Sequence, residues 1–327
     1  TTAGDYAIRQ SKPRYNYQSG KSQLILFTFA DISTITGIEK KVGYYNSSTT
    51  APYNTELDGI YLKSIDGVLY WCVSKNGVET AIPQSSWNKD TFPTLDATKA
   101  QIGWVDFEWL GVGRVRVGFV IDGAFVCVHE FLFANNSTST YMGSPNHSIR
   151  YEIRSTIGAS SFSQICATVG SEGAIDNTGI IRSWNSGTTE LVANSVGTKY
   201  ALFGARLKQS NLGTSIDIIA TSAFVSTATN ILVEVYYNPA VAGTFTYVDY
   251  PNSALQIAVG VGANTVSGGV LISSDYSEQR SGIKQIIETA LQLGATIDGV
   301  ADEIVCCVTP LSNNGRVLSS FDWREVQ

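Results

Sequence analysis

Three Asx-Gly dipeptides, each set between runs of alternating apolar and polar residues, constrain the fold of this chain more than any other feature. They are Asp-Gly at 66–67, Asn-Gly at 76–77 and Asp-Gly at 122–123. Because such a dipeptide between alternating hydrophobic residues is the strongest short-range signal of a β-hairpin, each one predicts two antiparallel strands joined by a tight turn. Three hairpins close together in the sequence predict an antiparallel sheet with one buried face.

The strand pattern extends over nearly the whole chain of 327 residues and predicts a mainly β protein. We expect an antiparallel β-sheet domain at 21–158, preceded by an N-terminal arm at 1–20. After 158 the chain becomes richer in Ser, Thr and Gly. We therefore place a domain boundary there and expect a second β-rich region at 159–327.

One segment, 281–293, departs from the strand pattern and predicts a single helix in the second region. Its apolar residues fall on helical spacing, and they are Ile283, Ile286, Ile287, Ala290, Leu291 and Leu293. Such spacing places them on one face of a helix. Gly294 follows at the position where glycine often ends a helix. We expect the apolar stripe to cover an edge or a face of a sheet.

The chain carries few charges, with 15% of its residues charged against about 25% in an average soluble domain. This low charge, with 43% hydrophobic residues, suits a protein that hides much of its surface in an assembly. The net charge of −6 repels nucleic acid, so we expect no direct nucleic-acid binding. The sequence has no apolar run long enough to span a bilayer, and we expect no membrane insertion.

The densest basic cluster lies in the predicted arm and includes Lys12 and Arg14. Two interpretations are open: a solvated segment, or a contact to phosphate or to an acidic neighbour. A polar arm of mixed charge can lie across a neighbouring subunit and become ordered on assembly. Lys12 and Arg14 are therefore candidate residues of an assembly arm.

Asp106 and Glu108 are the best catalytic candidates, because carboxylates two residues apart on a strand point to the same side. Their expected separation of about 6–7 Å fits acid–base chemistry on a glycosidic bond, with Trp104 and Trp109 beside them as sugar-stacking rings. However, the sequence lacks the third carboxylate of the Glu-x-Asp-x-x-Glu pattern of retaining enzymes on lectin-like sandwiches. We interpret both acids as structural, and expect no catalytic residue, no enzyme activity and no cofactor.

The cysteines and histidines have no spacing typical of a metal or redox site. The five cysteines are Cys72, Cys127, Cys166, Cys306 and Cys307. Cys127 and the pair at 306–307 lie in apolar strand-like runs, which predicts buried free thiols and folding in a reducing cytoplasm. His129 and His147 have no ligand or triad motif around them. We expect no metal site.

Trp87 is the tryptophan expected to be most exposed, because it lies in the turn-rich segment PQSSWN at 83–88. An exposed indole ring can stack on a sugar, but such residues more often fill sandwich cores and subunit interfaces. Trp87 is therefore a candidate ligand or interface aromatic residue, with packing or interface the favoured interpretation.

Several segments along the chain resemble a family of virion structural proteins of tailed phages and large DNA viruses. They are RYNYQSGK at 14–21, NGVETAIPQSSWN at 76–88, DFEWLGVG at 106–113, NPAVAGTFTY at 238–247, PNSA at 251–254, DEIV at 302–305, TPLS at 309–312 and FDWRE at 321–325. The resemblance spans nearly the whole chain. It implies an antiparallel β-sandwich of lectin-like or jelly-roll build at 21–158, in a protein present in many copies on a particle, with no catalytic residues to transfer.

The composition and the resemblance together predict a virion structural protein, folded in the host cytoplasm and located in the virion. Its expected partners are copies of itself and other virion proteins, since closed symmetric assemblies are the usual arrangement. The capsid, a vertex, a head fibre and a tail attachment remain open as locations. The alternative is a β-sandwich module on the particle surface that binds a host-surface glycan. A carbohydrate enzyme is the third hypothesis.

Overall fold

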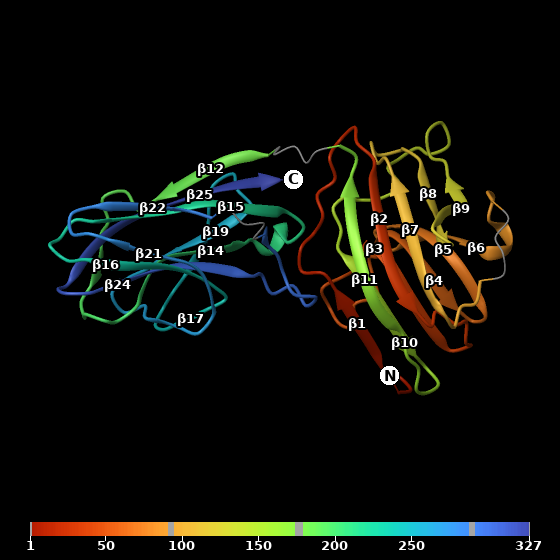
Figure 1. Cartoon of the computed structure of the whole chain (residues 1–327), viewed down its shortest axis with the longest axis horizontal. Helices are drawn as coiled ribbons and strands as arrows, with labels where there is room; N and C mark the ends of the chain where they lie inside the picture. Colours follow the sequence, from red (N-terminus) through yellow and green to blue (C-terminus); the bar gives the residue numbers. More distant parts are fainter. Residues whose placement is uncertain (1, 91–94, 174–178, 288–291, 327) are drawn as a thin grey trace. The chain divides into compact units, whose positions relative to one another are not determined.

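The computed structural model describes residues 2–90, 95–173, 179–287 and 292–326. The chain forms two compact units, Thr1–Asn177 and Thr178–Gln327, and each is built from antiparallel β-sheets (Figure 1). Within the described residues, the helical segments are two single turns of 3₁₀ helix, η1 (Gln84–Ser86) and η2 (Gln209–Asn211). None of the described helices is long and apolar enough to cross a membrane. The predicted mainly β fold is confirmed.

The first unit contains a six-stranded and a five-stranded sheet. The six-stranded sheet has the spatial order β1 (Tyr6–Gln10), β10 (Ile149–Ser155), β3 (Ile38–Asn46), β4 (Asp58–Ile65), β5 (Val68–Lys75) and β6 (Val78–Pro83). The five-stranded sheet has the order β11 (Ser163–Ser171), β2 (Gln23–Ala30), β7 (Ala100–Phe107), β8 (Val115–Ile121) and β9 (Ala124–Phe131). Apolar side chains of both sheets meet in one core, which includes Phe27, Trp71 and Phe119.

The three predicted hairpins are confirmed. Asp-Gly at 66–67 joins β4 to β5, Asn-Gly at 76–77 joins β5 to β6, and Asp-Gly at 122–123 joins β8 to β9. Both residues of each turn have positive φ, between 47° and 85°. This is the backbone of the type I′ turn, whose twist matches that of the flanking strands.

The second unit also contains two large sheets. The first has the order β12 (Ile180–Asn185), β25 (Gly315–Val326), β15 (Ser215–Val225) and β22 (Gly282–Ile286), with β13 (Leu191–Ala193) also paired to β25 and β23 (Gln292–Leu293) to β15. The second has the order β18 (Tyr247–Asp249), β19 (Leu255–Val259), β14 (Tyr200–Leu207), β24 (Glu303–Pro310), β16 (Ile231–Tyr237) and β21 (Val270–Ser277). A short two-stranded sheet pairs β17 (Ala240–Val241) with β20 (Val266–Ser267).

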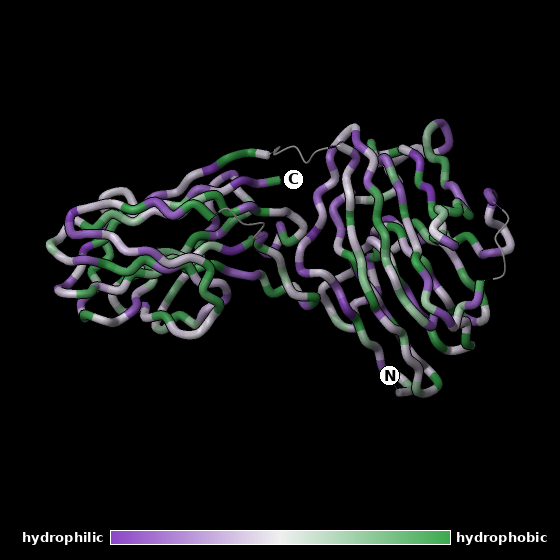
Figure 2. Tube along the Cα trace, in the orientation of Figure 1, coloured by the Kyte–Doolittle hydropathy of each residue, from purple (hydrophilic) through white to green (hydrophobic). Residues whose placement is uncertain are grey.

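The second unit has a core of its own, in which Phe203, Phe321 and Trp323 are fully or almost fully buried. The long strand β25 shows how the sequence builds this core. Its residues alternate between buried and more exposed positions along all of its length. Figure 2 shows hydrophobic and hydrophilic residues alternating along the strands of both units. This period of two residues is what a strand with one face on the core requires.

The helix predicted at 281–293 is wrong where the structure describes that segment. Gly282–Ile286 is the strand β22, which pairs with β15, and Gln292–Leu293 is β23. Residues 288–291 lie outside the described residues. Ile283 and Ile286 are β-branched, which favours strands, and pairing with β15 satisfies the backbone. The helical spacing of the apolar residues therefore predicted the wrong secondary structure for this segment.

The predicted boundary after residue 158 and the free N-terminal arm also need correction. β11 lies beyond that boundary but pairs with β2, and its Ala167 and Val169 pack against the first core. The Ser, Thr and Gly in this segment reflect the exposed face of an edge strand, not a new domain. Within the expected arm, Tyr6–Gln10 forms β1 and pairs with β10.

Candidate functional site

Trp87 is half-buried and packs against the first core, whereas Trp71, Trp104 and Trp323 are buried. The indole Nε1–H donates a hydrogen bond to the carbonyl oxygen of Ile82 at 3.2 Å. The Trp87 ring lies 6.2 Å from the ring of Phe119, centroid to centroid. The turn-rich segment folds back on the sandwich and carries the ring inward. This contact supports the packing interpretation of Trp87.

Arg14 is not part of a free arm. Its guanidinium lies near Asn146, with Nη1 3.4 Å from the Asn146 carbonyl oxygen that accepts its hydrogen bond. Burial lowers the pKa of Arg14, while the neighbouring Tyr44 and Asp58 act in the opposite direction. Lys12 lies on the exposed side of the same segment. Of the two candidate residues of an assembly arm, Arg14 is therefore held by a hydrogen bond within its own unit.

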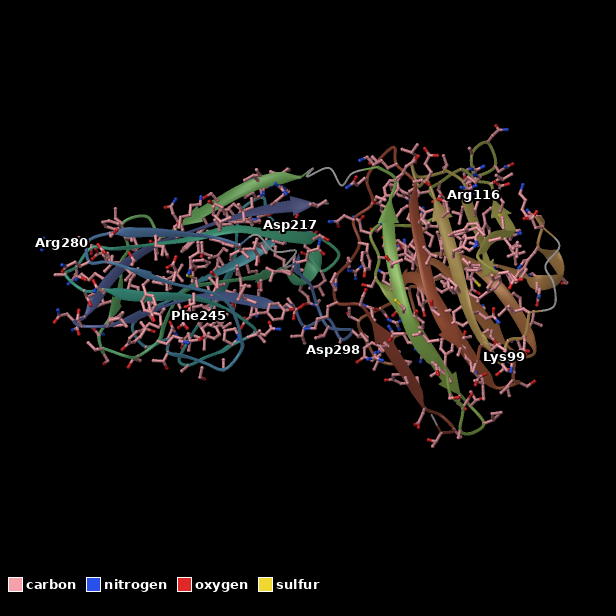
Figure 3. The ribbon with its side chains drawn as sticks, viewed as in Figure 1. Lys99, Arg116, Asp217, Phe245, Arg280 and Asp298 are labelled. Atoms are coloured by element: carbon pink, nitrogen blue, oxygen red, sulfur yellow. The ribbon has the colours of Figure 1, made fainter. Side chains whose placement is uncertain are left out.

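Asp106 and Glu108 differ in their surroundings. Asp106 lies on β7 and accepts hydrogen bonds from Ser22 Oγ at 2.6 Å and from Arg116 Nε at 2.8 Å (Arg116 is labelled in Figure 3). Glu108 is exposed and follows the last residue of β7, Phe107. The carboxylate of Asp106 is thus held by an ion pair, as the structural interpretation predicts.

The two histidines are buried. His147 is fully buried, packs edge-on against Tyr44 and has its Nε2 3.7 Å from Asp58 Oδ2. Burial lowers the pKa of His147 to about 3, and burial also lowers the pKa of His129. Both rings are therefore neutral near pH 7. Among the described residues, no group of three His, Cys, Asp or Glu side chains is arranged to hold a metal ion.

The five cysteines are free thiols, and three of them, Cys72, Cys306 and Cys307, are buried as expected for strand cores. Burial raises the pKa of each of these three thiols. Cys127 is half-buried and Cys166 is exposed on the edge strand β11. The prediction of buried thiols therefore holds for Cys306 and Cys307 but only partly for Cys127.

A buried ion network covers the face of the six-stranded sheet that points away from the core. Glu152 is 1% exposed and contacts three cations: Arg150, with Nη2 at 2.9 Å, Lys41, with Nζ at 3.5 Å, and Arg154. Arg150 also donates to the carbonyl oxygen of Tyr53 at 2.7 Å, so the segment between β3 and β4 folds over the network. Arg150, Glu152 and Arg154 lie on β10 and Lys41 lies on β3, so the cluster forms only when these two strands pair.

The second unit has one side that is formed by two edge strands, β21 and β22, which contact each other. We call this side the open edge. Its exposed apolar side chains include Val270, Leu271, Tyr276 and Ile286, and three of the four are more than 60% exposed. β21 is eight residues long, contains no Lys or Pro, and pairs on one side only, with β16, among the described strands.

Edge strands of this kind are association sites in general. Unpaired backbone N–H and C=O groups accept another strand, and native proteins protect them with charged residues, proline, bulges or a covering loop. β21 has two such features, a register shift opposite Val235 and Tyr236, and a single charge at Asp275. The apolar side chains nevertheless stand exposed beside the unpaired backbone. The open edge is therefore a candidate contact surface.

Comparison with known proteins adds little to this site. No protein-family model and no curated protein matches the chain. Among solved structures, the Emp47p carbohydrate recognition domain is 12% identical over 51% of this chain and 79% of its own, with a TM-score of 0.33. The structure of infectious bursal virus derived T=1 particles is 11% identical over 100% of this chain and 79% of its own, with a TM-score of 0.17. The structure of the Gx strain of infectious bursal disease virus is 12% identical over 98% of this chain and 79% of its own, also with a TM-score of 0.17. Likenesses this weak carry no argument about function.

Proposed function

We propose that this chain is a structural component of a virus or phage particle and that it assembles by packing against copies of itself. The open edge is the observation that carries this proposal. Exposed apolar side chains there flank a strand that pairs on one side only among the described strands, in a chain of which only 15% of the residues are charged. The sequence resemblance to virion structural proteins supports the same function. On this proposal the chain is not an enzyme.

The geometry of the open edge favours an antiparallel pair of β21 strands around a twofold axis. Closed twofold contacts present the same surface from both copies, so one strand supplies both halves of the interface. Backbone hydrogen bonds would extend the second sheet of the unit across the two copies. Leu271 and Tyr276 lie near opposite ends of β21. In an antiparallel pair, Leu271 of one copy would therefore lie near Tyr276 of the other copy.

The double variant Leu271→Lys with Tyr276→Lys tests this contact. Four lysines meet across the paired strands, and like charges facing each other destabilise a sheet contact. We expect self-association of the purified chain to weaken by about tenfold or more, measured by sedimentation equilibrium. Leu132→Lys is the matched control, because Leu132 is 58% exposed in a loop of the first unit. Equal association of the double variant and the control would rule out the open edge.

A glycan-binding module is the alternative function, and Trp87 does not support it because its indole is engaged with the core. An observation in the second unit does support a saccharide site, and it does not depend on the open edge.

A further inference from the structure

The second unit has a cavity of about 440 Å³ on the outer face of its second sheet. It is lined by Arg206, Val241, Gly243, Phe245, Thr246, Tyr247 and Glu303. The two-stranded β17–β20 sheet lies over the neighbouring part of this face, where Val241 and Val266 pack on Val305 and Cys307 (Figure 1). Phe245, labelled in Figure 3, follows β17 and precedes β18.

The pairing of strands brings the polar residues of the cavity together. Arg206 on β14 lies directly opposite Glu303 on β24. Tyr247 on β18 is opposite Ala258 on β19, and Ala258 is in turn opposite Gly204 on β14. Tyr247 therefore reaches across the sheet toward the Arg206–Glu303 pair. These positions are far apart in the sequence, and only the sheet joins them.

Gly204 allows two aromatic rings to lie directly on the backbone of β14. A Cβ atom at this position would lie 2.5 Å from the Tyr247 hydroxyl oxygen and 2.7 Å from the ring of Phe245. Both distances are too short for any side chain. Phe245 and Tyr247 pack edge-to-face, with ring centroids 5.5 Å apart. The floor of the cavity is thus fixed by a glycine and an aromatic pair.

Hydrogen bonds hold the charged groups in place. The Tyr247 hydroxyl donates to Glu303 Oε2 at 2.7 Å, and Arg206 Nε donates to Gln256 Oε1 at 2.9 Å. The Arg206 guanidinium lies over the Tyr247 ring, 4.1 Å from its centroid. The two Nη atoms of Arg206 and Oε1 of Glu303 make no further hydrogen bond with the described residues. These atoms are oriented and available for a ligand.

The chemistry of these groups identifies the ligand class. A guanidinium supplies donors and a carboxylate supplies acceptors, while their charges cancel. Because the two charges lie opposite each other and cancel, the pair gives no net attraction to an anion or to a cation. Hydroxyl groups can both accept from Arg206 and donate to Glu303, and the C–H face of a sugar ring packs on an aromatic side chain such as Phe245. We propose that this cavity binds a neutral saccharide.

An array of neutral and sialylated oligosaccharides tests the proposal with the purified full chain. We expect binding to at least one neutral glycan, followed by a loss of about tenfold or more in affinity for Arg206→Gln and for Glu303→Gln, because each removes a charge-assisted hydrogen bond. Both substitutions keep side chains of similar size. Circular dichroism and thermal melting establish that the variants stay folded.

Lys284→Gln is the matched control, because Lys284 forms an exposed ion pair with Asp322 on the other sheet of the same unit. Its glycan binding should equal that of the wild type. The proposal is overturned by a wild-type chain that binds no neutral glycan, by binding restricted to sialylated glycans, or by binding that survives both cavity substitutions. The oligomeric state does not enter this test, so its failure leaves the assembly proposal standing.

Discussion

Replacing Glu152 by alanine should destabilise the first unit by about 3–5 kcal/mol, the effect of leaving buried charges without their partner. Arg150, Lys41 and Arg154 surround this carboxylate, and their side chains are 2%, 4% and 13% exposed. With Glu152 removed, Arg150 and Arg154 lose their carboxylate partner, and Lys41 keeps only Glu39, whose Oε1 is 2.9 Å from Lys41 Nζ. Denaturant unfolding followed by hydrogen exchange of peptides from the first unit measures the loss.

Glu130→Ala is the matched control for this experiment. Glu130 also pairs with cations, Lys89 at 2.7 Å and Arg114 at 3.3 Å, but their side chains are 44% and 54% exposed. Water can solvate these cations once the carboxylate is gone, so we expect a loss of about 1 kcal/mol or less. Similar losses for the two variants would show that the buried network does not stabilise the unit.

The same network makes the stability of the first unit depend on pH. Burial raises the pKa of Glu152, but Lys41, Arg150 and Arg154 outweigh burial, and the net pKa lies below the ordinary value of 4.5. A carboxylate with a lowered pKa stabilises the folded state above its unfolded pKa, and this stabilisation is lost as the pH falls through the folded pKa. The difference in stability between wild type and Glu152→Ala should therefore shrink below about pH 4.5.

Trp323→Ala should destabilise the second unit by about 3–5 kcal/mol, as expected for removing a fully buried large aromatic side chain. Trp323 is 0% exposed, and its ring packs 5.0 Å from Phe321 and 5.3 Å from Tyr250, centroid to centroid. Its Nε1–H also donates to Glu325 Oε1 at 2.9 Å, so the substitution removes a buried hydrogen bond as well. Hydrogen exchange of peptides from the second unit measures the effect.

Trp184→Ala provides the comparison within the same sheet. Trp184 lies on the edge strand β12 and only partly packs against the core, where its ring is 5.2 Å from that of Phe203. We expect a smaller loss of stability than for Trp323→Ala. The two units have separate cores, so neither substitution should change the exchange of peptides from the first unit. A loss of protection that spreads equally over both units would contradict this division.

The sequence predicted the features that depend on neighbouring residues. The hairpins at 66–67, 76–77 and 122–123 follow from the positive φ that Asp, Asn and Gly accept, which is a local property. The mainly β fold follows from an alternation that is visible within each strand.

Features set by distant pairing were predicted incorrectly. The segment at 282–286 has helical spacing in its apolar residues, but pairing with β15 decides that it is a strand. The domain boundary was placed too early because nothing local to β11 indicates its pairing with β2. The turn-rich segment around Trp87 indicates exposure, but it does not reveal the contact of this ring with Phe119, which comes from another strand.

The candidate sites could not be assembled from the sequence. Phe245, Tyr247 and Glu303 lie in two segments that carry the family resemblance, 238–247 and 302–305, but Arg206 and Gly204 lie in neither. The open edge could not be predicted from the sequence for a related reason. Whether Val270, Leu271 and Tyr276 are exposed depends on β21 being the last strand of its sheet, which is a property of the topology.

The mass of the purified wild-type chain in solution tests the central claim most directly. One chain has a mass of 35.2 kDa. Light scattering across a concentration series should give a mass that exceeds this value and rises toward a defined multiple as the concentration increases, because the open edges of two copies pair. A mass that stays at that of one chain at every concentration would contradict assembly through the open edge.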